Sequence, residues 1–403
     1  MNSLNRVLDA ARTHPLYREH WGNVATLAEA PIVTKRELAA RLDALVEASQ
    51  VGLGIYWSSS GGSGGRAMCF PVDVHENHQQ RRLLANRIAS AGILTAESVV
   101  LNLFPSCPMV RSSEIFTEFS ELCGGTPLPS PVNSSLREGA TGYDEAWGAA
   151  ERFGANVLAG MPSALVDFAY WCGVEKRRCS FDTVLFGGEF LHPQRRAMFE
   201  ALFEVKRFAA VYGSAETGIV GYTSDVREPA VYAIPREIAV VEIPRPDAEG
   251  VGNLVVTNLV RLRHPLVRFD TGDRGRIVGE TDNEMLIELH ARDSGTFEFQ
   301  GAYHELSRLA RVLDLYGEWQ LVIGDDVEGC DVQGREKLTC LIAAEAGISG
   351  EDEAKLLAYL GDQIDPYDGG RIEIHEIAGN QFRTVGVSDK RPQVVDLRRQ
   401  ADE

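Results

Sequence analysis

Residues 211–218 read Val211-Tyr-Gly-Ser-Ala-Glu-Thr-Gly218, which sets an aromatic ring and a carboxylate around a turn that glycine permits. Such a segment is suited to stacking a planar base on Tyr212 and to holding Mg²⁺ with Glu216, because Mg²⁺ prefers oxygen ligands. Gly213 and Ser214 would bring the backbone close to the same ligand. A core aromatic residue followed by a solvated carboxylate is the plain structural alternative.

A loop rich in hydroxyl groups and glycine lies upstream, at residues 58–66, between the strand-like stretches 54–57 and 68–72. Free backbone N–H groups in such a loop can wrap a polyphosphate. A flexible surface linker has a similar composition, so the loop alone leaves both interpretations open. The candidate phosphate-binding residues are Ser59, Ser60, Gly61, Gly62, Ser63, Gly64 and Arg66.

A third segment, Arg268-Phe-Asp-Thr-Gly-Asp273, lies downstream. We expect Asp273 to accept hydrogen bonds from ribose hydroxyl groups, because it follows a strand-like run and an ionised carboxylate is an acceptor. A surface turn is the alternative for Asp273. For Arg268, the alternative to a role in the site is an ion pair with a neighbouring carboxylate.

These three segments, in this order, resemble the adenylate-forming superfamily of acyl-CoA synthetases, peptide-synthetase adenylation domains and luciferases. The closest resemblance is to its phenylacetate-CoA ligase branch, which includes proteins like coenzyme F390 synthetase. The opening segments 15–18 and 30–35 are also similar to that branch. The resemblance implies that Tyr212 stacks on adenine, that Glu216 holds Mg²⁺ and that Asp273 binds the ribose.

The resemblance extends to Phe186-Gly-Gly-Glu189, where Gly188 and Glu189 would lie at the nucleotide. Glycine there lets the backbone approach a ligand closely. For Glu189, a carboxylate favoured at a helix start is the alternative. The residues after Phe104 depart from the branch, and Arg111 among them predicts a polar or anionic substituent on the substrate. The acyl pocket implied in this way is formed by Phe104, Arg111, Phe186, Gly187 and Gly213.

Two segments near the end of the chain resemble the parts of the family that move. Residues 290–293 match its hinge, with Asp293 as the pivot and Arg292 as a ribose or phosphate partner. Residues 388–396 match its terminal loop, in which Lys390 would bridge the carboxylate and the α-phosphate during adenylation. An exposed basic turn is the alternative for Lys390. In the loop at 58–66, Gly65-Arg66 replaces the Lys-Pro of the family, so Arg66 lies one position beyond the family's lysine. In the terminal loop, Asp389 replaces a glycine.

The composition is that of a globular protein, with 403 residues, 44% apolar and 24% charged. The net charge of −18 argues against nucleic acid or an anionic membrane as a partner. The seven cysteines form no C-x-x-C pair, so we expect buried, reduced thiols and a cytoplasmic protein. Residues 1–12 predict an amphipathic helix without the apolar region of a signal peptide, and 155–171 is too interrupted to span a membrane.

Short apolar strands alternate with helical patterns up to about residue 229, which predicts an α/β fold. The strands are expected at 98–104, 157–159, 183–186 and 208–212, and the helices at 75–91, 143–152, 163–172 and 193–202. Hairpins follow at 237–243, 253–257, 275–278 and 284–289 and predict a β-barrel-like subdomain. We place the large domain at residues 1–293. A small, mobile α+β domain at 294–403 would hold strands at 337–344 and 371–377 and a helix near 351–364, capped by Ser349 and Asp352.

The resemblance implies ATP-dependent activation of a small, aromatic carboxylic acid as an acyl-adenylate, with release of pyrophosphate and transfer to CoA. ATP, Mg²⁺ and CoA are therefore the expected cofactors and partners. No zinc-binding cysteine insertion follows Thr217, so no structural metal is expected. The open alternatives are transfer to a carrier-protein thiol or an amine, activation of nitrite for diazotising an aryl amine, and a degenerate nucleotide-binding module. The sequence leaves open whether the protein is a homodimer.

Overall fold

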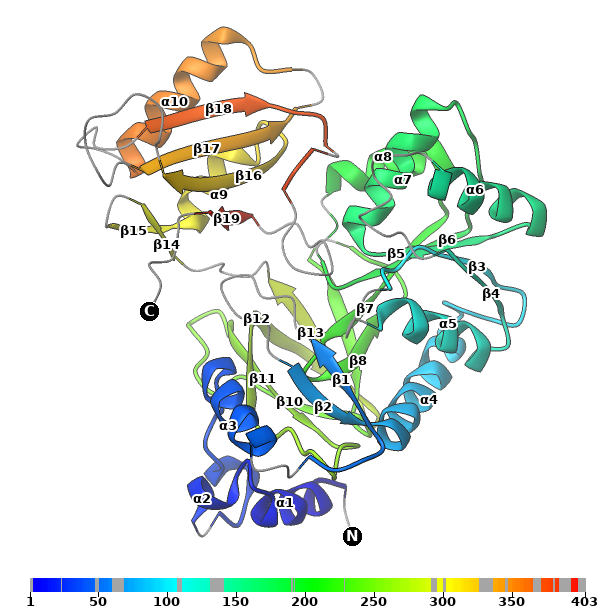
Figure 1. Cartoon of the computed structure of the whole chain (residues 1–403), viewed down its shortest axis with the longest axis vertical. Coiled ribbons are helices and arrows are strands. Elements are labelled where there is room, and N and C mark those ends of the chain that lie inside the picture. Colours follow the sequence, from blue (N-terminus) through cyan, green and yellow to red (C-terminus); the bar gives the residue numbers. More distant parts are fainter. Residues whose placement is uncertain are drawn as a thin grey trace. The chain divides into compact units, whose positions relative to one another are not determined.

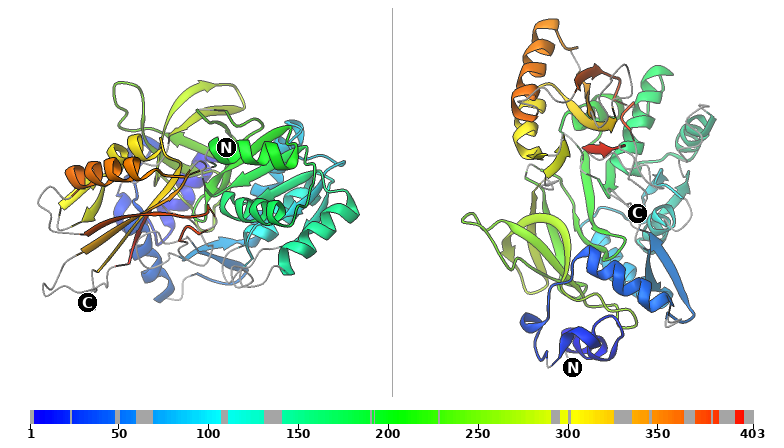
Figure 2. Two further views of the ribbon diagram at one scale, coloured as in Figure 1. Left: turned by 90° about the horizontal axis from the view of Figure 1, so that it is seen from above. Right: turned by 60° about the vertical axis from the view of Figure 1, so that its left-hand side comes forward.

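The chain folds into two compact units (Figures 1 and 2). The computed structural model describes residues 3–397 except 23, 48–50, 60–68, 107–110, 131–140, 190, 192, 228, 291–295, 300–301, 326–335, 345–346, 365–370, 380 and 384–392. Among the described residues, the larger unit reaches residue 290 and the smaller unit begins at residue 296. The domain boundary predicted at residue 293 lies outside the described residues.

One half of the larger unit's 11-stranded sheet is parallel, in the order β7-β6-β5-β3-β4. β5 and β6 are buried along their whole length, as expected of parallel strands that helices cover on both faces. The predicted alternation of strands and helices is confirmed here. The elements are α4 (Val74–Ser90), β3 (Val99–Asn102), α5 (Ser112–Leu122), β4 (Thr126–Pro129), α6 (Thr141–Phe153), β5 (Val157–Gly160), α7 (Pro162–Val174), β6 (Thr183–Gly187), α8 (Pro193–Phe203) and β7 (Arg207–Ser214).

The other half of this sheet is antiparallel and continues from β7 in the order β8-β9-β13-β12-β11-β10. The predicted hairpins all lie in it, but β12 begins six residues earlier than the expected strand at 275. The polar run before residue 275 is drawn into the strand because β11 pairs with β12 from Phe269 onward, whereas β13 joins on the other side only from Arg274. The elements are β8 (Gly218–Thr223), β9 (Val231–Pro235), β10 (Ala239–Glu242), β11 (Gly252–Asn258), β12 (Phe269–Glu280) and β13 (Glu284–His290).

The N-terminal helices and a short hairpin pack on the antiparallel half through a second apolar core. The predicted N-terminal helix is α1, whose residues Val7, Leu8 and Ala11 are buried. Tyr17 fixes this region, because its buried hydroxyl donates to the Pro265 carbonyl at 3.0 Å and accepts from the Val267 N–H at 3.1 Å. The elements are α1 (Ser3–Thr13), α2 (Arg18–Trp21), η1 (Leu27–Glu29), α3 (Lys35–Glu47), β1 (Ile55–Ser59) and β2 (Cys69–Asp73).

The smaller unit is a four-stranded sheet in the order β18-β17-β16-β19, with its own apolar core. The predicted strands at 337–344 and 371–377 and the helix near 351–364 are confirmed, whereas β16 and α9 were not expected. Ser349 caps the helix: its hydroxyl accepts from the Asp352 N–H at 3.2 Å and donates to the Asp352 carboxylate at 2.6 Å. The elements are β14 (Thr296–Phe299), β15 (Ala302–Glu305), α9 (Leu306–Leu313), β16 (Glu318–Asp325), β17 (Glu336–Ala343), α10 (Gly350–Ile364), β18 (Arg371–Glu376) and β19 (Val394–Asp396).

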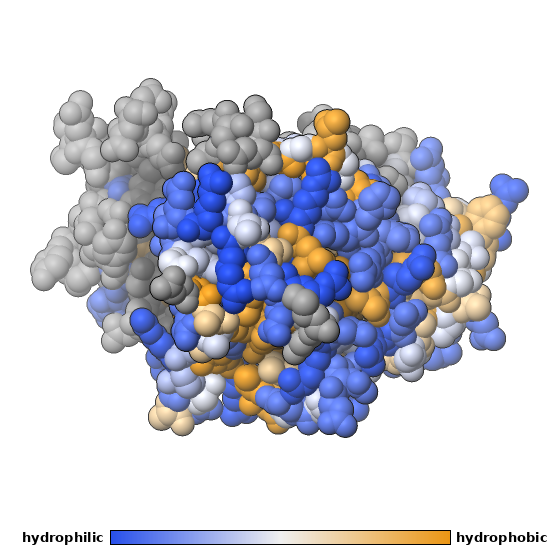
Figure 3. Space-filling model, turned by 90° about the horizontal axis from the view of Figure 1, so that it is seen from below, coloured by the Kyte–Doolittle hydropathy of each residue, from blue (hydrophilic) through white to orange (hydrophobic). Residues whose placement is uncertain are grey.

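Hydrophilic side chains (blue) are spread over the described surface in the view of Figure 3, with apolar ones (orange) between them. Within the described part of the chain, no helix is long and apolar enough to cross a membrane. The cysteines placed there are free thiols; Cys172 and Cys340 are buried, as predicted, whereas Cys69, Cys123 and Cys179 are only partly buried. Burial raises the pKa of the Cys172 thiol to about 12, so it stays protonated at neutral pH.

Candidate functional site

Tyr212 and Asp273, predicted as the base-stacking and ribose-binding residues, lie side by side. The Tyr212 hydroxyl donates to Oδ2 of Asp273 at 2.9 Å, although the two residues are 61 positions apart. Tyr212 ends the buried part of β7 at the carboxyl edge of the parallel strands, and Asp273 lies on β12. Ligands of open α/β sheets bind at that edge, so the pair marks a candidate nucleotide site.

The turn that follows Tyr212 is closed by its own side chains. The Ser214 N–H donates to Oγ1 of Thr217 at 3.0 Å, and the Thr217 N–H donates to Oγ of Ser214 at 3.2 Å. Gly213 is required because a Cβ atom there would overlap the Gly218 carbonyl oxygen and lie 2.6 Å from Cα of Ile219. The backbone of this segment is therefore held in one conformation.

Two buried side-chain amides hydrogen-bond to the backbone of this turn. Nδ2 of Asn258 donates to the Thr217 carbonyl and to Oε1 of Gln80, both at 2.9 Å. Nε2 of Gln80 donates in turn to the carbonyls of Thr217 at 3.2 Å and Ile219 at 3.0 Å. We call these two residues, Gln80 on α4 and Asn258 on β11, the amide clamp. Sequence analysis missed the clamp, because its partners are up to 178 positions apart and form no motif.

Glu216, the predicted Mg²⁺ ligand, has a buried carboxylate that is only 5% exposed. Its Oε1 lies 3.5 Å from Nζ of Lys35 at the start of α3. The buried Arg261 guanidinium donates to the Glu216 backbone carbonyl, and burial lowers the pKa of Arg261 because charge is disfavoured in an apolar setting. The Glu216 carboxylate is thus buried and already faces a positive charge, as a protein ligand of Mg²⁺ would.

Further oxygen ligands for Mg²⁺ would have to come from the nucleotide. Among the residues that the structure describes, no group of three or more His, Cys, Asp or Glu side chains is arranged to hold a metal ion. Mg²⁺ in nucleotide sites is commonly bound by one or two carboxylates together with phosphate oxygens and water. Glu216 is suited to that arrangement rather than to a protein cage.

Three of the residues predicted to line the acyl pocket, Phe104, Phe186 and Gly187, lie near the carboxyl ends of β3 and β6. Phe104 stacks on Phe116, with ring centroids 3.7 Å apart and planes 9° apart. A Cβ atom at Gly187 would lie 2.7 Å from Cγ2 of Val211 and 4.0 Å from Cζ of Phe116, so only glycine allows this packing. Phe186 is buried in the same core, and Gly188 has a left-handed φ of 84°. Phe116 was not among the predicted residues.

Arg111 lies against an aromatic ring of the β1 hairpin. Its guanidinium carbon is 4.5 Å from the centroid of the Tyr56 ring, a cation–π contact. Nη2 of Arg81 reaches the Tyr56 hydroxyl at 3.4 Å, and Arg81 also forms an ion pair with Glu118. Two arginines thus flank Tyr56, and only one of them has a carboxylate partner among these contacts.

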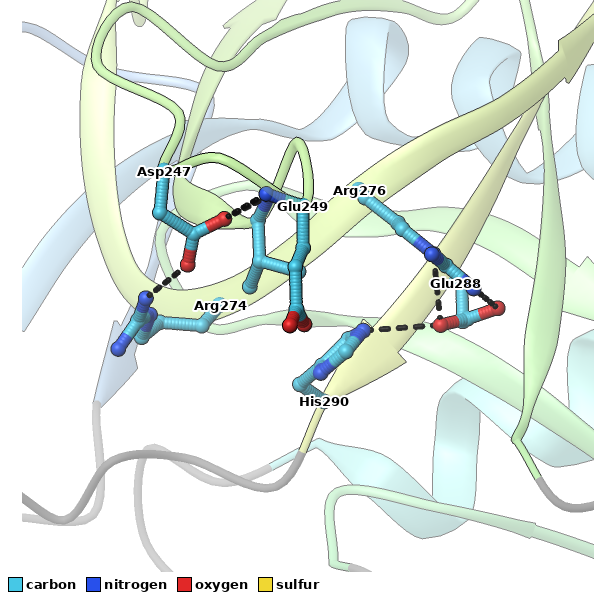
Figure 4. A network of polar contacts seen from close by, with 7 residues as sticks. Asp247, Glu249, Arg274, Arg276, Glu288 and His290 are labelled. Carbon is cyan, nitrogen blue, oxygen red and sulfur yellow. Dashed lines mark hydrogen bonds and ion pairs between the residues drawn. The ribbon is translucent and has the colours of Figure 1, made fainter.

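The strands that lead to the predicted hinge carry an ion network, drawn in Figure 4. Glu288 is paired with Arg276 at 2.9 Å and with Nε2 of His290 at 2.9 Å. These partners, Arg276 first, hold the pKa of the Glu288 carboxyl below its usual value. The network ties β12 to the last residue of β13, so the end of the larger unit is fixed up to residue 290.

Arg268 has a structural role, which is the alternative that the sequence left open. Its side chain pairs with Glu242 at 3.1 Å and donates to the backbone carbonyls of Ala28 and Ala30 at 3.1 and 2.6 Å. Ser59 ends β1 opposite Cys69, which brackets the predicted phosphate loop between paired strands. Glu189 is half-buried after β6. The predicted residues that lie outside the described part of the chain are Ser60, Gly61, Gly62, Ser63, Gly64, Arg66, Arg292, Asp293 and Lys390.

Comparison with known proteins finds a partial match in sequence and a more extensive match in fold. No model of a protein family matches the chain. A segment of 148 residues is 27% identical to the indoleacetate–lysine synthetase of Pseudomonas savastanoi; the match covers 36% of this chain and 35% of that protein.

Solved structures match far more of the chain. 2-Hydroxyisobutyryl-CoA ligase, in the postadenylation state with 2-HIB-AMP, matches 98% of this chain and 88% of its own, with a TM-score of 0.70 and 15% identity. ATP-bound MatB from Rhodopseudomonas palustris matches 84% of this chain and 66% of its own, with a TM-score of 0.52 and 15% identity. The predicted α/β fold with a large N-terminal and a small C-terminal part is confirmed, and the chain has the fold of the adenylate-forming ligases.

Proposed function

We propose that this protein activates a small carboxylic acid with ATP, as an acyl-adenylate, and then transfers the acyl group to CoA. The observation that carries the proposal is the hydrogen bond between Tyr212 and Asp273, together with the buried carboxylate of Glu216, four residues after Tyr212. An aromatic ring, a ribose acceptor and a cation-binding carboxylate are the three groups that a Mg²⁺-nucleotide needs. The fold supports the same conclusion.

In this proposal each residue has one task. The Tyr212 ring stacks on adenine, and Asp273 accepts hydrogen bonds from the ribose. Glu216 holds Mg²⁺, which would supply charge neutralisation at the phosphates. The loop from Ser59 to Gly64 and Arg66 binds the polyphosphate, and Lys390 stabilises the charge that develops as pyrophosphate leaves. Arg292 would contact the nucleotide, and rotation about Asp293 would exchange the two half-reactions.

The acid is proposed to be small and aromatic, with a polar or anionic substituent. Phe104 and Phe186 are buried, and the Phe104–Phe116 stack lies next to Gly187, so aromatic side chains form the surroundings proposed for the acid. Arg111 on Tyr56 supplies the positive charge for the substituent. Replacing Arg111 with Met should therefore lower the preference for anionic over neutral acids.

An amine acceptor is the second candidate. The curated relative is named as a synthetase that joins indoleacetate to lysine, whereas the ligase that matches 98% of the chain is a CoA ligase. Because the chain spans about a third of that relative, the amine remains the alternative to CoA. Nitrite activation and a degenerate module are separated from these by the same assay. A carrier-protein thiol as acceptor would give acid-dependent release that neither CoA nor lysine raises.

The test is acid-dependent release of pyrophosphate from ATP and Mg²⁺, with a panel of aryl acids, with and without CoA, with lysine, and with nitrite plus an aryl amine. Release that rises with CoA supports the proposal, and release that rises only with lysine supports the second candidate. ATP binding without pyrophosphate release under any of these conditions would indicate a degenerate module. Lys390→Ala would then have no turnover to lose, whereas in a ligase it should abolish release.

Asp273→Ala tests the site itself. A hydrogen bond to a charged group contributes about 1.5–3 kcal/mol, so the KM for ATP should rise roughly 10- to 100-fold. Asp282→Ala removes an exposed carboxylate at the far end of the β12–β13 hairpin and should leave the KM unchanged. Equal KM values for the two variants would contradict the assignment of Asp273.

A further inference from the structure

The backbone around Lys35 is fixed to the strand that carries Asp273. Val33 forms a parallel bridge with Phe269: its N–H donates to the Arg268 carbonyl at 2.9 Å, and its carbonyl accepts from the Asp270 N–H at 3.0 Å. Lys35 follows two residues later as the first residue of α3. Its Cα is thus held next to the candidate ribose-binding segment.

Two further sets of contacts hold the same segment. The Arg268 guanidinium binds the carbonyls of Ala28 and Ala30 from a buried position, as described above. At the helix start, Oε2 of Glu37 accepts from the N–H and the hydroxyl of Thr34, both at 2.8 Å, and Oγ1 of Thr34 accepts from the Glu37 N–H. This is a capping box, which fixes the direction in which α3 begins. Residues 28–37 therefore form a rigid base for the Lys35 side chain.

The Lys35 side chain reaches from this base to Glu216. Its Nζ lies 3.5 Å from Oε1 of Glu216, and the side chain is 51% exposed while that of Glu216 is 5% exposed. A buried carboxylate is costly without a compensating cation. Arg261 is close, but its guanidinium bonds to the Glu216 backbone carbonyl. Among the ion pairs of the described residues, Lys35 is the partner of the Glu216 carboxylate.

We propose that Lys35 is a built-in counter-ion that occupies the cation position at Glu216 and is displaced when the divalent metal of the nucleotide binds there. The proposal rests on the function proposed above. A half-exposed lysine on a flexible stem can leave for solvent at little cost, since exposed ion pairs contribute little stability. Lys35 thereby sets the metal concentration at which the site is occupied, and it keeps Glu216 paired until then.

The expected effect follows from repulsion between Lys35 and the incoming metal. A single charge and a double charge about 5 Å apart repel each other even in water-like surroundings, which would weaken metal binding roughly 5- to 30-fold. Salt reduces this value, because the site is open enough for half of the lysine to be exposed. Removing the lysine charge should therefore tighten metal binding roughly three- to tenfold.

The test measures Mn²⁺ binding by electron paramagnetic resonance in the presence of α,β-methylene-ATP, which cannot form an adenylate. Lys35→Met should lower the Kd for Mn²⁺ roughly three- to tenfold, whereas Lys35→Arg should keep the wild-type value because it keeps the charge. Thermal melting checks that each variant is folded. An unchanged or higher Kd for folded Lys35→Met overturns the proposal, and a higher Kd would mean that the lysine helps to bind the phosphates.

Lys206→Met is the matched control, because Lys206 also forms an ion pair, with Asp182 at 2.6 Å. Lys206 immediately precedes β7, so it lies about 25 Å from the Glu216 end of this eight-residue strand. Its loss should leave the Kd for Mn²⁺ unchanged, and an equal effect of both lysines would overturn the proposal.

Glu216→Gln separates this proposal from the proposed function. If Glu216→Gln weakens Mn²⁺ binding but Lys35→Met does not strengthen it, the counter-ion role fails and the nucleotide site stands. If Glu216→Gln has no effect on Mn²⁺ binding, both fail together. In parallel, the Mg²⁺ concentration for half-maximal pyrophosphate release should fall in Lys35→Met.

Discussion

Replacing Asn258 with Ala should destabilise the larger unit, because the amide clamp holds the turn at the candidate site. The Asn258 side chain is fully buried and takes part in four hydrogen bonds. Besides its bonds to Thr217 and Gln80, its Oδ1 accepts from the N–H groups of Val260 at 2.9 Å and Arg261 at 3.0 Å. Alanine leaves all four partners in a space that water does not reach.

The magnitude follows from these contacts. A typical hydrogen bond contributes about 1 kcal/mol net, and a buried polar group left without a partner costs about 1–3 kcal/mol. The four costs do not add in full, because Gln80 can still bond to Thr217 and Ile219 and the loop can relax. A loss of about 3–4 kcal/mol in the free energy of unfolding is expected, as for other broken polar networks.

Urea unfolding followed by tryptophan fluorescence measures this loss. Four of the five tryptophans lie in the larger unit, which therefore dominates the signal: Trp21, Trp57, Trp147 and Trp171. Asn253→Ala is the matched control, because Asn253 is exposed on the same strand and makes one bond, to Asp270 at 3.2 Å. It should cost about 0.5 kcal/mol or less. Equal losses for the two variants would refute the role of the amide clamp.

Two more results are expected. Gly213→Ala should lower the Tm by several degrees and abolish ATP binding, because its Cβ would overlap the backbone of Gly218. Gly148→Ala on helix α6 is the control: a Cβ there meets no atom within 4 Å, so this variant should be neutral or stabilising. An unchanged Tm for Gly213→Ala would contradict the steric argument. Burial, with His264 beside it, lowers the pKa of His14 from 6.5 to about 4, so stability should be greatest above pH 6.5 and fall by about 2 kcal/mol toward pH 4 as the unfolded chain takes up the proton. His14→Asn should remove that part of the pH dependence in urea titrations, and an unchanged profile would mean that His14 does not titrate in this way.

The sequence predicted those helices and strands that a local pattern of apolar residues marks. Helix α4 has a 3.6-residue period and strands β5 and β6 are apolar runs, and each was predicted within two residues at either end. The start of β12 was not, because the run from Asp270 to Asp273 has the composition of a turn. Pairing with β11, in which Asp270 takes part, draws those polar residues into a strand, with Gly272 in a left-handed conformation, and this pairing is a tertiary contact.

The candidate site was predicted where a short motif carries it. Tyr212, Glu216 and Asp273 lie in motifs, and the structure brings Tyr212 and Asp273 into contact. The two residues of the amide clamp have ordinary local surroundings. Lys35 lies in segment 30–35, which resembles the family branch, but that resemblance assigned no role to the lysine. Their roles arise from contacts between positions 41 to 181 residues apart, from the bond of Asn258 to Thr217 up to the pair of Lys35 with Glu216.

The attachment of the N-terminal segment also has a consequence for how the protein is made. Tyr17, Ala28 and Ala30 find their partners 238 to 250 residues later in the chain. A ribosome adds about 5–20 residues per second, so these partners emerge about 10–50 s after the segment itself. During that time its apolar residues have no core to enter. The first 47 residues are therefore the part of the nascent chain that we expect chaperones to bind, and the nucleotide site closes only after residue 273 has left the ribosome.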